Sequence, residues 1–286
     1  MSKKEKVYFF TALAILLAIF TFTDLSISKA VYNPESSFGH FFEAFGELPG
    51  AIIGVFSMAA LIITGKYDTK WKTILFNLIF TVLLILFSFM AAVMPMNYLG
   101  GISMPLAGGL AAGYALVSLW IANILRKEES KNLREGAIIG ILTFVAAIFV
   151  INIIKMCWGR LRFRSMVAPY NEFSLWFLPQ RFTSNNEYMS FPSGHSANSA
   201  VIWWITLLPT FVSELRGKEK CLKLVAGTWI VMVMISRVIM GAHFASDVTL
   251  GASLSIICFY LISKWVKRTP SQIKEKGNGS VIKKNI

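Results

Sequence analysis

The chain has 286 residues, of which 55% are hydrophobic and only 15% are charged, and its mean hydropathy is +0.61. Soluble domains carry charge on about a quarter of their residues, so this composition excludes a soluble globular protein. The formal net charge of +13 does not indicate a nucleic-acid partner, because the basic residues stand in short blocks between apolar runs. Such blocks are typical of cytoplasmic loops in membrane proteins. We therefore predict an all-α fold, a polytopic membrane helical bundle.

Eight apolar segments follow one another along the chain, and each has about the 17–25 residues that a membrane span requires. They cover roughly residues 7–28, 48–65, 73–95, 102–125, 136–154, 196–213, 224–240 and 247–266. The first follows a short basic N-terminus, as in a secretory signal, but no clean cleavage site comes after it, so we interpret it as a retained helix. The scattered cysteines Cys157, Cys221 and Cys258 indicate neither a disulfide framework nor a metal site.

The basic residues favour one orientation in the membrane. Most of them lie in the first six residues, in every second connection between segments and in the tail after Trp265. The positive-inside rule then predicts a multi-pass protein of the cell membrane with both termini in the cytoplasm. Lys155, Arg160, Arg162, Arg164 and nearby basic residues fall on the opposite side, where we expect the functional site to face outward.

We divide the chain into an N-terminal four-helix membrane region (residues 1–135), a membrane core (residues 136–268) and a disordered cytoplasmic tail (residues 269–286). The first outward loop contains Glu35, His40, Glu43 and Glu47, which we interpret as a solvated face rather than a metal site. The connection from Lys155 to Pro192 is rich in aromatic residues, as expected at the membrane–water interface. It is either a packed re-entrant loop or a lid that contacts a lipid, and the sequence leaves both open.

Three polar stretches on the outward side have the side chains that a phosphate site needs. Lys155 and Arg162 follow the fifth segment, and Arg237 ends the seventh. Guanidinium groups bind phosphate oxygens in pairs, and lysine adds a compact charge. Ser193 and Gly194 open the sixth segment, where a helix N-terminus would direct backbone N–H groups at the same anion. These residues predict a site for a multiply charged anion.

Two histidines add chemistry to this anion site. If a helix begins near His243, Asp247 lies one turn further on the same face and can hold one imidazole nitrogen, leaving the other as a nucleophile. His195, beside Gly194, is placed to protonate a leaving oxygen and then to activate water. The residues thus predict phosphoryl transfer through a phosphohistidine. No metal or cofactor is needed, because three cations neutralise the charge.

The three stretches resemble the signature of the type 2 phosphatidic acid phosphatase superfamily, which also includes vanadium haloperoxidases and glucose-6-phosphatase. That signature has a Lys, six residues and Arg-Pro, then Pro-Ser-Gly-His, then Ser-Arg, five residues, His, three residues and Asp. Here the three parts are Lys155 to Arg162, Pro192 to His195, and Ser236 to Asp247. This chain departs from the family at Phe163, which replaces the proline, and in its eight apolar segments against the family's six-helix core.

The resemblance implies a role for each matching residue. It implies that His243 is the nucleophile, that Asp247 orients it, and that His195 is the general acid and base. The residues implied to bind the substrate phosphate are Lys155, Arg162, Ser193, Gly194 and Arg237.

The resemblance also implies an integral membrane phosphatase that acts on a lipid substrate without a metal. The substrate would be a lipid phosphate such as phosphatidate or phosphatidylglycerol phosphate, or a prenyl pyrophosphate such as undecaprenyl pyrophosphate. A lipid-linked phosphotransferase with the same phosphohistidine is the alternative within the enzyme class. A lipid transporter or scramblase is the alternative outside it, but a transport path does not need the His243–Asp247 spacing. A non-catalytic binding protein is disfavoured because every residue with a chemical role is present.

Overall fold

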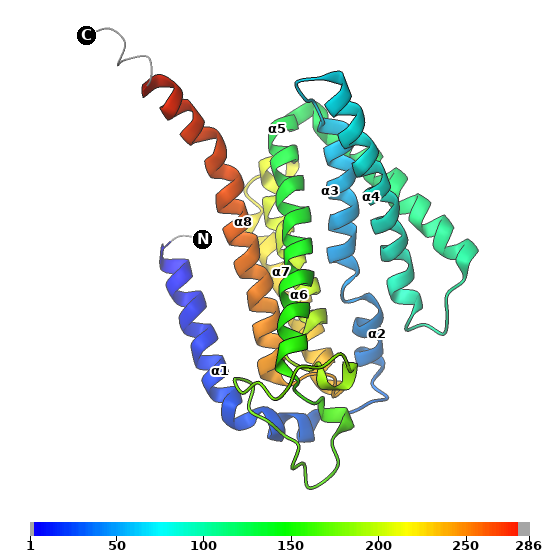
Figure 1. Cartoon of the computed structure of the whole chain (residues 1–286), viewed down its shortest axis with the longest axis vertical. Helices are drawn as coiled ribbons and strands as arrows, with labels where there is room; N and C mark the ends of the chain where they lie inside the picture. The colour runs from blue at the N-terminus through cyan, green and yellow to red at the C-terminus, as the bar shows by residue number, and fades with distance from the viewer. Residues whose placement is uncertain (1–2, 280–286) are drawn as a thin grey trace.

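The computed structural model describes the backbone of residues 3–279 and the side chains of residues 3–268. Within this part of the chain every regular element is helical and no β-strand is present, as predicted. Figure 1 shows the long helices running side by side, with the irregular connection of residues 159–193 at one end of the bundle. We call this end the loop end.

The helices differ widely in length. The α-helices are α1 (Lys3–Val31), α2 (Ser37–Phe45), α3 (Leu48–Thr64), α4 (Lys70–Met96), α5 (Met104–Trp158), α6 (Gly194–Ala200), α7 (Glu219–Ile239) and α8 (Ala245–Gly279). The 3-10 helices are η1 (Phe163–Ser165), η2 (Asn186–Tyr188), η3 (Val201–Thr210) and η4 (Ser213–Leu215). Ser36 and Thr69 accept hydrogen bonds from backbone N–H groups of the following turns, so they cap the starts of α2 and α4.

Six helical stretches among the described residues are long and apolar enough to cross a membrane, so the predicted count of eight is not confirmed. One cause is α5, in which Glu129 has non-helical φ and ψ of −145° and 61°. This kink divides α5 into two arms that correspond to the predicted segments 102–125 and 136–154, so two predicted spans fall within one of the six stretches. The other cause is the predicted segment 196–213, which is divided between α6 and η3.

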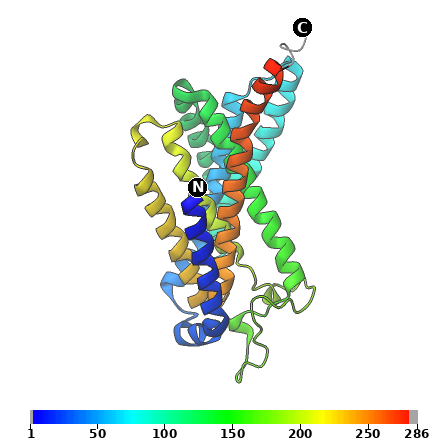
Figure 2. The same ribbon diagram turned by 90° about the vertical axis from the view of Figure 1, so that its left-hand side faces the viewer.

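The arrangement of the helices keeps the N-terminal part of the chain in contact with the predicted core. Figures 1 and 2 both show α1 lying along α8, and α5 runs through the predicted boundary at residue 135. The division into two membrane regions therefore stays a prediction. The predicted disordered tail covers residues 269–286; α8 continues through its first part to Gly279, residues 280–286 lie outside the described part, and the tail stays a prediction.

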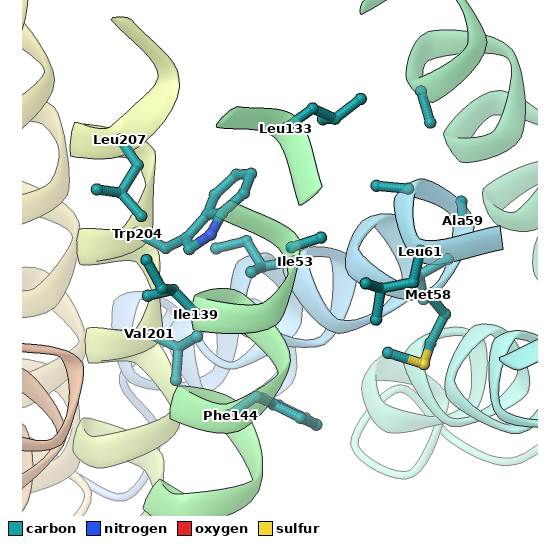
Figure 3. Close-up of a cluster of buried hydrophobic side chains, with 14 of the residues drawn as sticks. Ile53, Met58, Ala59, Leu61, Leu133, Ile139, Phe144, Val201, Trp204 and Leu207 are labelled. Carbon is teal, nitrogen blue, oxygen red and sulfur yellow. The ribbon is translucent and has the colours of Figure 1, made fainter. Parts of the chain in front are cut away.

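The main core lies between α3, the second arm of α5 and η3 (Figure 3). Trp204 of η3 is buried there, and its indole Nε1 donates a 2.7 Å hydrogen bond to the carbonyl of Gly136. A Cβ added to Gly140 would lie 2.5 Å from Oγ of Ser57, so the close approach of α5 to α3 requires glycine. Small residues permit such contacts between helices in lipid. This core fixes the helix ends that carry the polar residues of the loop end.

Candidate active site

The structure brings all eight predicted site residues together at the loop end. They come from the end of α5 (Lys155), the connection after it (Arg162), the start of α6 (Ser193, Gly194 and His195), the end of α7 (Arg237), the turn before α8 (His243) and the first turn of α8 (Asp247). Segments far apart in the sequence therefore form one cluster.

The start of α6 lies directly against α8. The backbone N–H of Ser193 donates a 3.0 Å hydrogen bond to the carbonyl of Asp247. A Cβ added to Gly251 would be 2.3 Å from the Ser193 carbonyl oxygen, so glycine in α8 permits this contact. Ser193 is also the N-cap of α6, and its hydroxyl accepts from the N–H and the hydroxyl of Ser196. On the other side, a Cβ added to Gly194 would be 3.6 Å from Cε of Lys155.

The three predicted phosphate-binding cations are held in different ways. Nζ of Lys155 donates a 2.9 Å hydrogen bond to the carbonyl of Met189. Arg162 donates from Nε and Nη2 to the backbone carbonyl and side-chain oxygen of Asn186, at 3.0 and 2.8 Å. Arg237 is 1% exposed, and among the described residues its Nε and Nη1 have no hydrogen-bond partner. Buried donors without partners are costly, so Arg237 presents two N–H groups that suit an anion.

His243 does not make the expected direct hydrogen bond with Asp247. Its Nδ1 lies 2.6 Å from the carbonyl oxygen of Ser190 and 4.0 Å from Oδ2 of Asp247. The reason is that α8 begins at Ala245, so His243 lies in the preceding turn and not on the same helix face. Asp247 instead accepts from the hydroxyl of Ser190 at 2.5 Å and from the N–H of Phe244 at 2.9 Å. Asp247 thus supports His243 indirectly: it binds Ser190, whose carbonyl contacts the ring, and Phe244, which follows His243 in the chain.

The protonation of His243 follows from these contacts. A carbonyl oxygen only accepts, so Nδ1 carries the proton and Nε2 keeps its lone pair. Burial is the largest cause that lowers the pKa of His243 well below its usual value, and the positive charges of Lys155 and Arg162 lower it further. The imidazole is therefore neutral at neutral pH, as a nucleophile must be.

Arg160 has a larger role than the sequence suggests. The sequence placed Arg160 only on the outward side and gave it no site role, but its side chain is fully buried. It donates to Asp247 at 2.5 Å, to Asp24 at 3.0 Å and to the hydroxyl of Ser246 at 3.0 Å. Asp24 is the one acidic residue in the first apolar segment. An ionisable residue in an apolar segment indicates a buried partner of opposite charge. Asp24 was therefore the sequence signal for the contact with Arg160.

Arg164, by contrast, is partly exposed. Its Nη2 lies 2.6 Å from Oε1 of Glu187, and this hydrogen bond is the largest cause that holds the pKa of Glu187 at about 2. The pair joins two parts of the connection between α5 and α6. Exposed pairs of this kind contribute little to stability.

Of the four polar residues predicted to form a solvated face in the first outward loop, Glu35 and His40 are exposed, but Glu43 and Glu47 are not. Glu43 of α2 pairs with Arg237, with Oε1 2.9 Å from Nη2. Glu47, which precedes α3, lies with its Oε2 3.8 Å from Nε2 of His195. Their side chains are only 14% and 15% exposed. Sequence spacing carried no signal for these contacts, because the partners lie about 150 or more residues away.

Aromatic packing holds the first part of the connection between α5 and α6. Phe163, which replaces the family's proline, is buried and stacks on Tyr170 with ring centroids 5.6 Å apart. Trp176 donates from Nε1 to the hydroxyl of Thr21 at 2.9 Å. This part is therefore a packed loop, whereas Phe182 further along is 71% exposed. Packing of Phe163 restrains the backbone just after Arg162, where the ring of proline would otherwise do so.

Part of the chain is similar in sequence to known proteins. Residues 136–270 match the PAP2 superfamily. Over 75 residues the chain is 40% identical to phosphatidylglycerophosphatase B of Bacillus subtilis (strain 168), and this match covers 26% of the chain and 37% of that protein. No solved structure matches the chain significantly. The region that matches the superfamily contains all eight predicted site residues.

Proposed function

On the premise that residues 136–270 belong to the PAP2 superfamily, we propose that this membrane protein hydrolyses a lipid phosphate through a phosphohistidine intermediate. One observation carries the proposal. Three cations converge on His243, whose Nδ1 carries the ring proton and whose Nε2 keeps its lone pair, and one of these cations, Arg237, has two buried N–H groups without a hydrogen-bond partner in the described part of the chain. A multiply charged anion would satisfy these donors and lie beside the nucleophile.

In the first step, the lone pair of Nε2 of His243 attacks the phosphorus atom. An N–P bond forms, the bond from phosphorus to the lipid oxygen breaks, and His195 gives its proton to that oxygen. The Ser190 carbonyl accepts from Nδ1–H of His243, and it stabilises the positive charge that develops on the ring. Lys155, Arg162 and Arg237 neutralise the phosphoryl oxygens.

In the second step, His195 takes a proton from water, and the water oxygen attacks phosphorus. The N–P bond breaks, inorganic phosphate leaves, and His243 regains its lone pair. Every charge that the reaction develops has a partner among these residues, so we propose that the reaction needs no metal.

An apolar cavity supports a substrate with a lipid tail. Its volume is about 740 Å³, and its wall is built from α3, the first arm of α5 and η3. The lining begins at Pro49, two residues after Glu47, which lies against His195. Cavities of about 300–1,000 Å³ hold ligands in many proteins. We propose phosphatidylglycerol phosphate as the first substrate to test, with phosphatidate and a prenyl pyrophosphate as alternatives, because the relative is named for activity on phosphatidylglycerol phosphate.

We propose that the loop end faces outward and that both termini are cytoplasmic. Figure 1 shows that the connections between α3 and α4 and between η3 and α7 lie at the end away from the loop end. These connections are rich in Lys and Arg, which remain in the cytoplasm. A cysteine placed within residues 164–190 of a variant without its native cysteines should react with an impermeant reagent on intact cells. Labelling that occurs only after permeabilisation would show that the loop end faces the cytoplasm, and it would refute the proposed orientation.

The activity is tested with purified protein in detergent, with a chelator present. We expect release of phosphate from phosphatidylglycerol phosphate, loss of that release in His243→Ala, and covalent phosphate on the wild-type chain after acid-free quenching. Cys258→Ser, which lies away from the site, is the control. Equal activity of His243→Ala, or an absolute need for a divalent metal, would refute the mechanism.

A further inference from the structure

Glu47 lies at the corner between α2 and α3, outside the region that matches the superfamily. Its Oε2 is 3.8 Å from Nε2 of His195, and both side chains are largely buried, at 15% and 16% exposure. We propose that Glu47 is a positioning residue for His195, which it holds in one orientation and supports in the protonated form. This inference rests on the proposed function, in which His195 is the general acid.

The carboxylate of Glu47 is itself held in place. Its Oε1 accepts a 2.8 Å hydrogen bond from the side-chain amide of Asn198, which follows His195 on α6. The contact requires α3 to begin close to α6. A Cβ added to Gly50 would be 2.5 Å from the carbonyl oxygen of Asn198, so glycine in the first turn of α3 permits this approach. One oxygen of Glu47 is thus anchored, and the other faces the imidazole.

The imidazole of His195 has a free position for this carboxylate. Its Nε2 is buried and has no hydrogen-bond partner among the described residues. Hydrogen bonds of catalytic groups are often long before substrate binds and shorten in the complex. A short movement of either side chain would close the 3.8 Å separation into a hydrogen bond to a protonated ring. The other ring nitrogen, Nδ1, is then left to serve the leaving oxygen.

The surroundings of His195 explain why a carboxylate is needed. Six charged or titratable groups surround it, each from a different place in the chain, and they are Glu43, Glu47, Tyr98, Lys155, Arg237 and His243. Burial is the largest cause that disfavours a positive imidazole, Arg237 and Lys155 disfavour it further, and Glu43 is already paired with Arg237. Glu47 is the carboxylate whose free oxygen points at the ring, so it offsets the cations at the step in which His195 must hold a proton.

Two substrates with different leaving groups test the role of Glu47. A lipid alkoxide needs a proton to leave, whereas the p-nitrophenolate of p-nitrophenyl phosphate leaves without one. We expect Glu47→Gln to lower kcat for the lipid phosphate by about 10- to 100-fold, part of what a general acid contributes. We expect KM, and the release of p-nitrophenolate in the first turnover, to stay close to wild type. Only the first turnover separates the two substrates, because the second step uses His195 with either of them. The alkaline limb of kcat against pH should move to lower pH, because the variant holds the proton less firmly.

The control is Glu43→Gln, which removes a neighbouring carboxylate that faces Arg237 and not the ring. It should change KM without any dependence on the leaving group. In a His195→Ala background, Glu47→Gln should have no further effect, because a positioning residue acts only through its partner. Glu47→Asp should recover part of the lost activity.

The outcomes separate this inference from the proposed function. If wild-type protein releases no phosphate from either substrate, both are overturned. If wild-type protein is active but Glu47→Gln slows the first turnover equally on both substrates, or adds to the loss in His195→Ala, only the positioning role is overturned. Thermal unfolding of each variant in the same detergent shows whether a uniform loss comes from misfolding.

Discussion

Replacement of Arg160 by methionine tests the buried ion network beneath the site. The guanidinium is fully buried between Asp24 and Asp247, and its Nε also donates a 3.0 Å hydrogen bond to the carbonyl of Ser174. Methionine keeps an unbranched chain that can fill the space, but it removes the charge and every hydrogen bond. Two buried carboxylates then lose the cation that they share.

The magnitude follows from the burial of this network. Removal of one partner from a buried ion pair costs about 3–5 kcal/mol. A carboxylate without its cation avoids this cost only by binding a proton, and for an ordinary aspartic acid at pH 7 that costs about 4 kcal/mol. The two values agree. We therefore expect Arg160→Met to lower the free energy of unfolding by about 3–5 kcal/mol, and Asp24→Asn in the same chain to restore part of it.

The assay is chemical unfolding in detergent micelles, followed by tryptophan fluorescence. Arg164→Met is the matched control, because Arg164 pairs with the partly exposed Glu187. An exposed pair contributes less than about 1 kcal/mol, so the control should unfold almost as the wild type does. The reasoning is refuted if Arg160→Met is no less stable than Arg164→Met, or if Asp24→Asn destabilises it further.

Two more predictions concern the substrate and the nucleophile. Leucine at Gly109 should displace about two methylene groups of a lipid tail from the apolar cavity. It should raise KM for a long-chain lipid phosphate about tenfold and leave the KM for p-nitrophenyl phosphate unaffected. Leucine at Gly108, which has open space but does not line the cavity, is the control, and equal effects of both substitutions would contradict a tail site. Because burial and nearby cations hold the pKa of His243 well below its usual value, we expect the acid limb of kcat/KM against pH to lie well below pH 6.5. A limb centred at the ordinary histidine value of about 6.5 would show that the nucleophile is not shielded in this way.

The sequence predicted those parts of the site that depend on local order along the chain. Lys155, His195 and Arg237 lie at helix ends that face one side, and alternation of basic and apolar stretches is enough to place such ends together. The apolar segments were likewise recognisable from length and hydropathy, because a span must be about 20 residues long. Those features depend only on residues that lie close together in the sequence.

The remaining features depend on contacts between distant segments. Glu43 and Glu47 looked like solvated loop residues because nothing nearby in the sequence marks their partners, which lie on α6 and α7. The direct bond expected between His243 and Asp247 was wrong because it assumed a helix start two residues before the observed one, Ala245. The predicted segment 196–213 did not form one long helix, because it is divided between the short α6 and the 3-10 helix η3. Helix boundaries of this kind vary by a residue or two even between methods.

The pairing of Arg160 with both Asp24 and Asp247 also has a consequence for biosynthesis. Asp24 lies 136 residues before Arg160, and Asp247 lies 87 residues after it. Because chains are made from the N-terminus, Asp24 is available to neutralise Arg160 as soon as that residue enters the membrane, while Asp247 is still unmade. The early pair protects a buried charge during insertion, and α8 completes the network when it packs. The turn that carries His243, the proposed nucleophile, is therefore ordered only as synthesis of residues 136–268 ends.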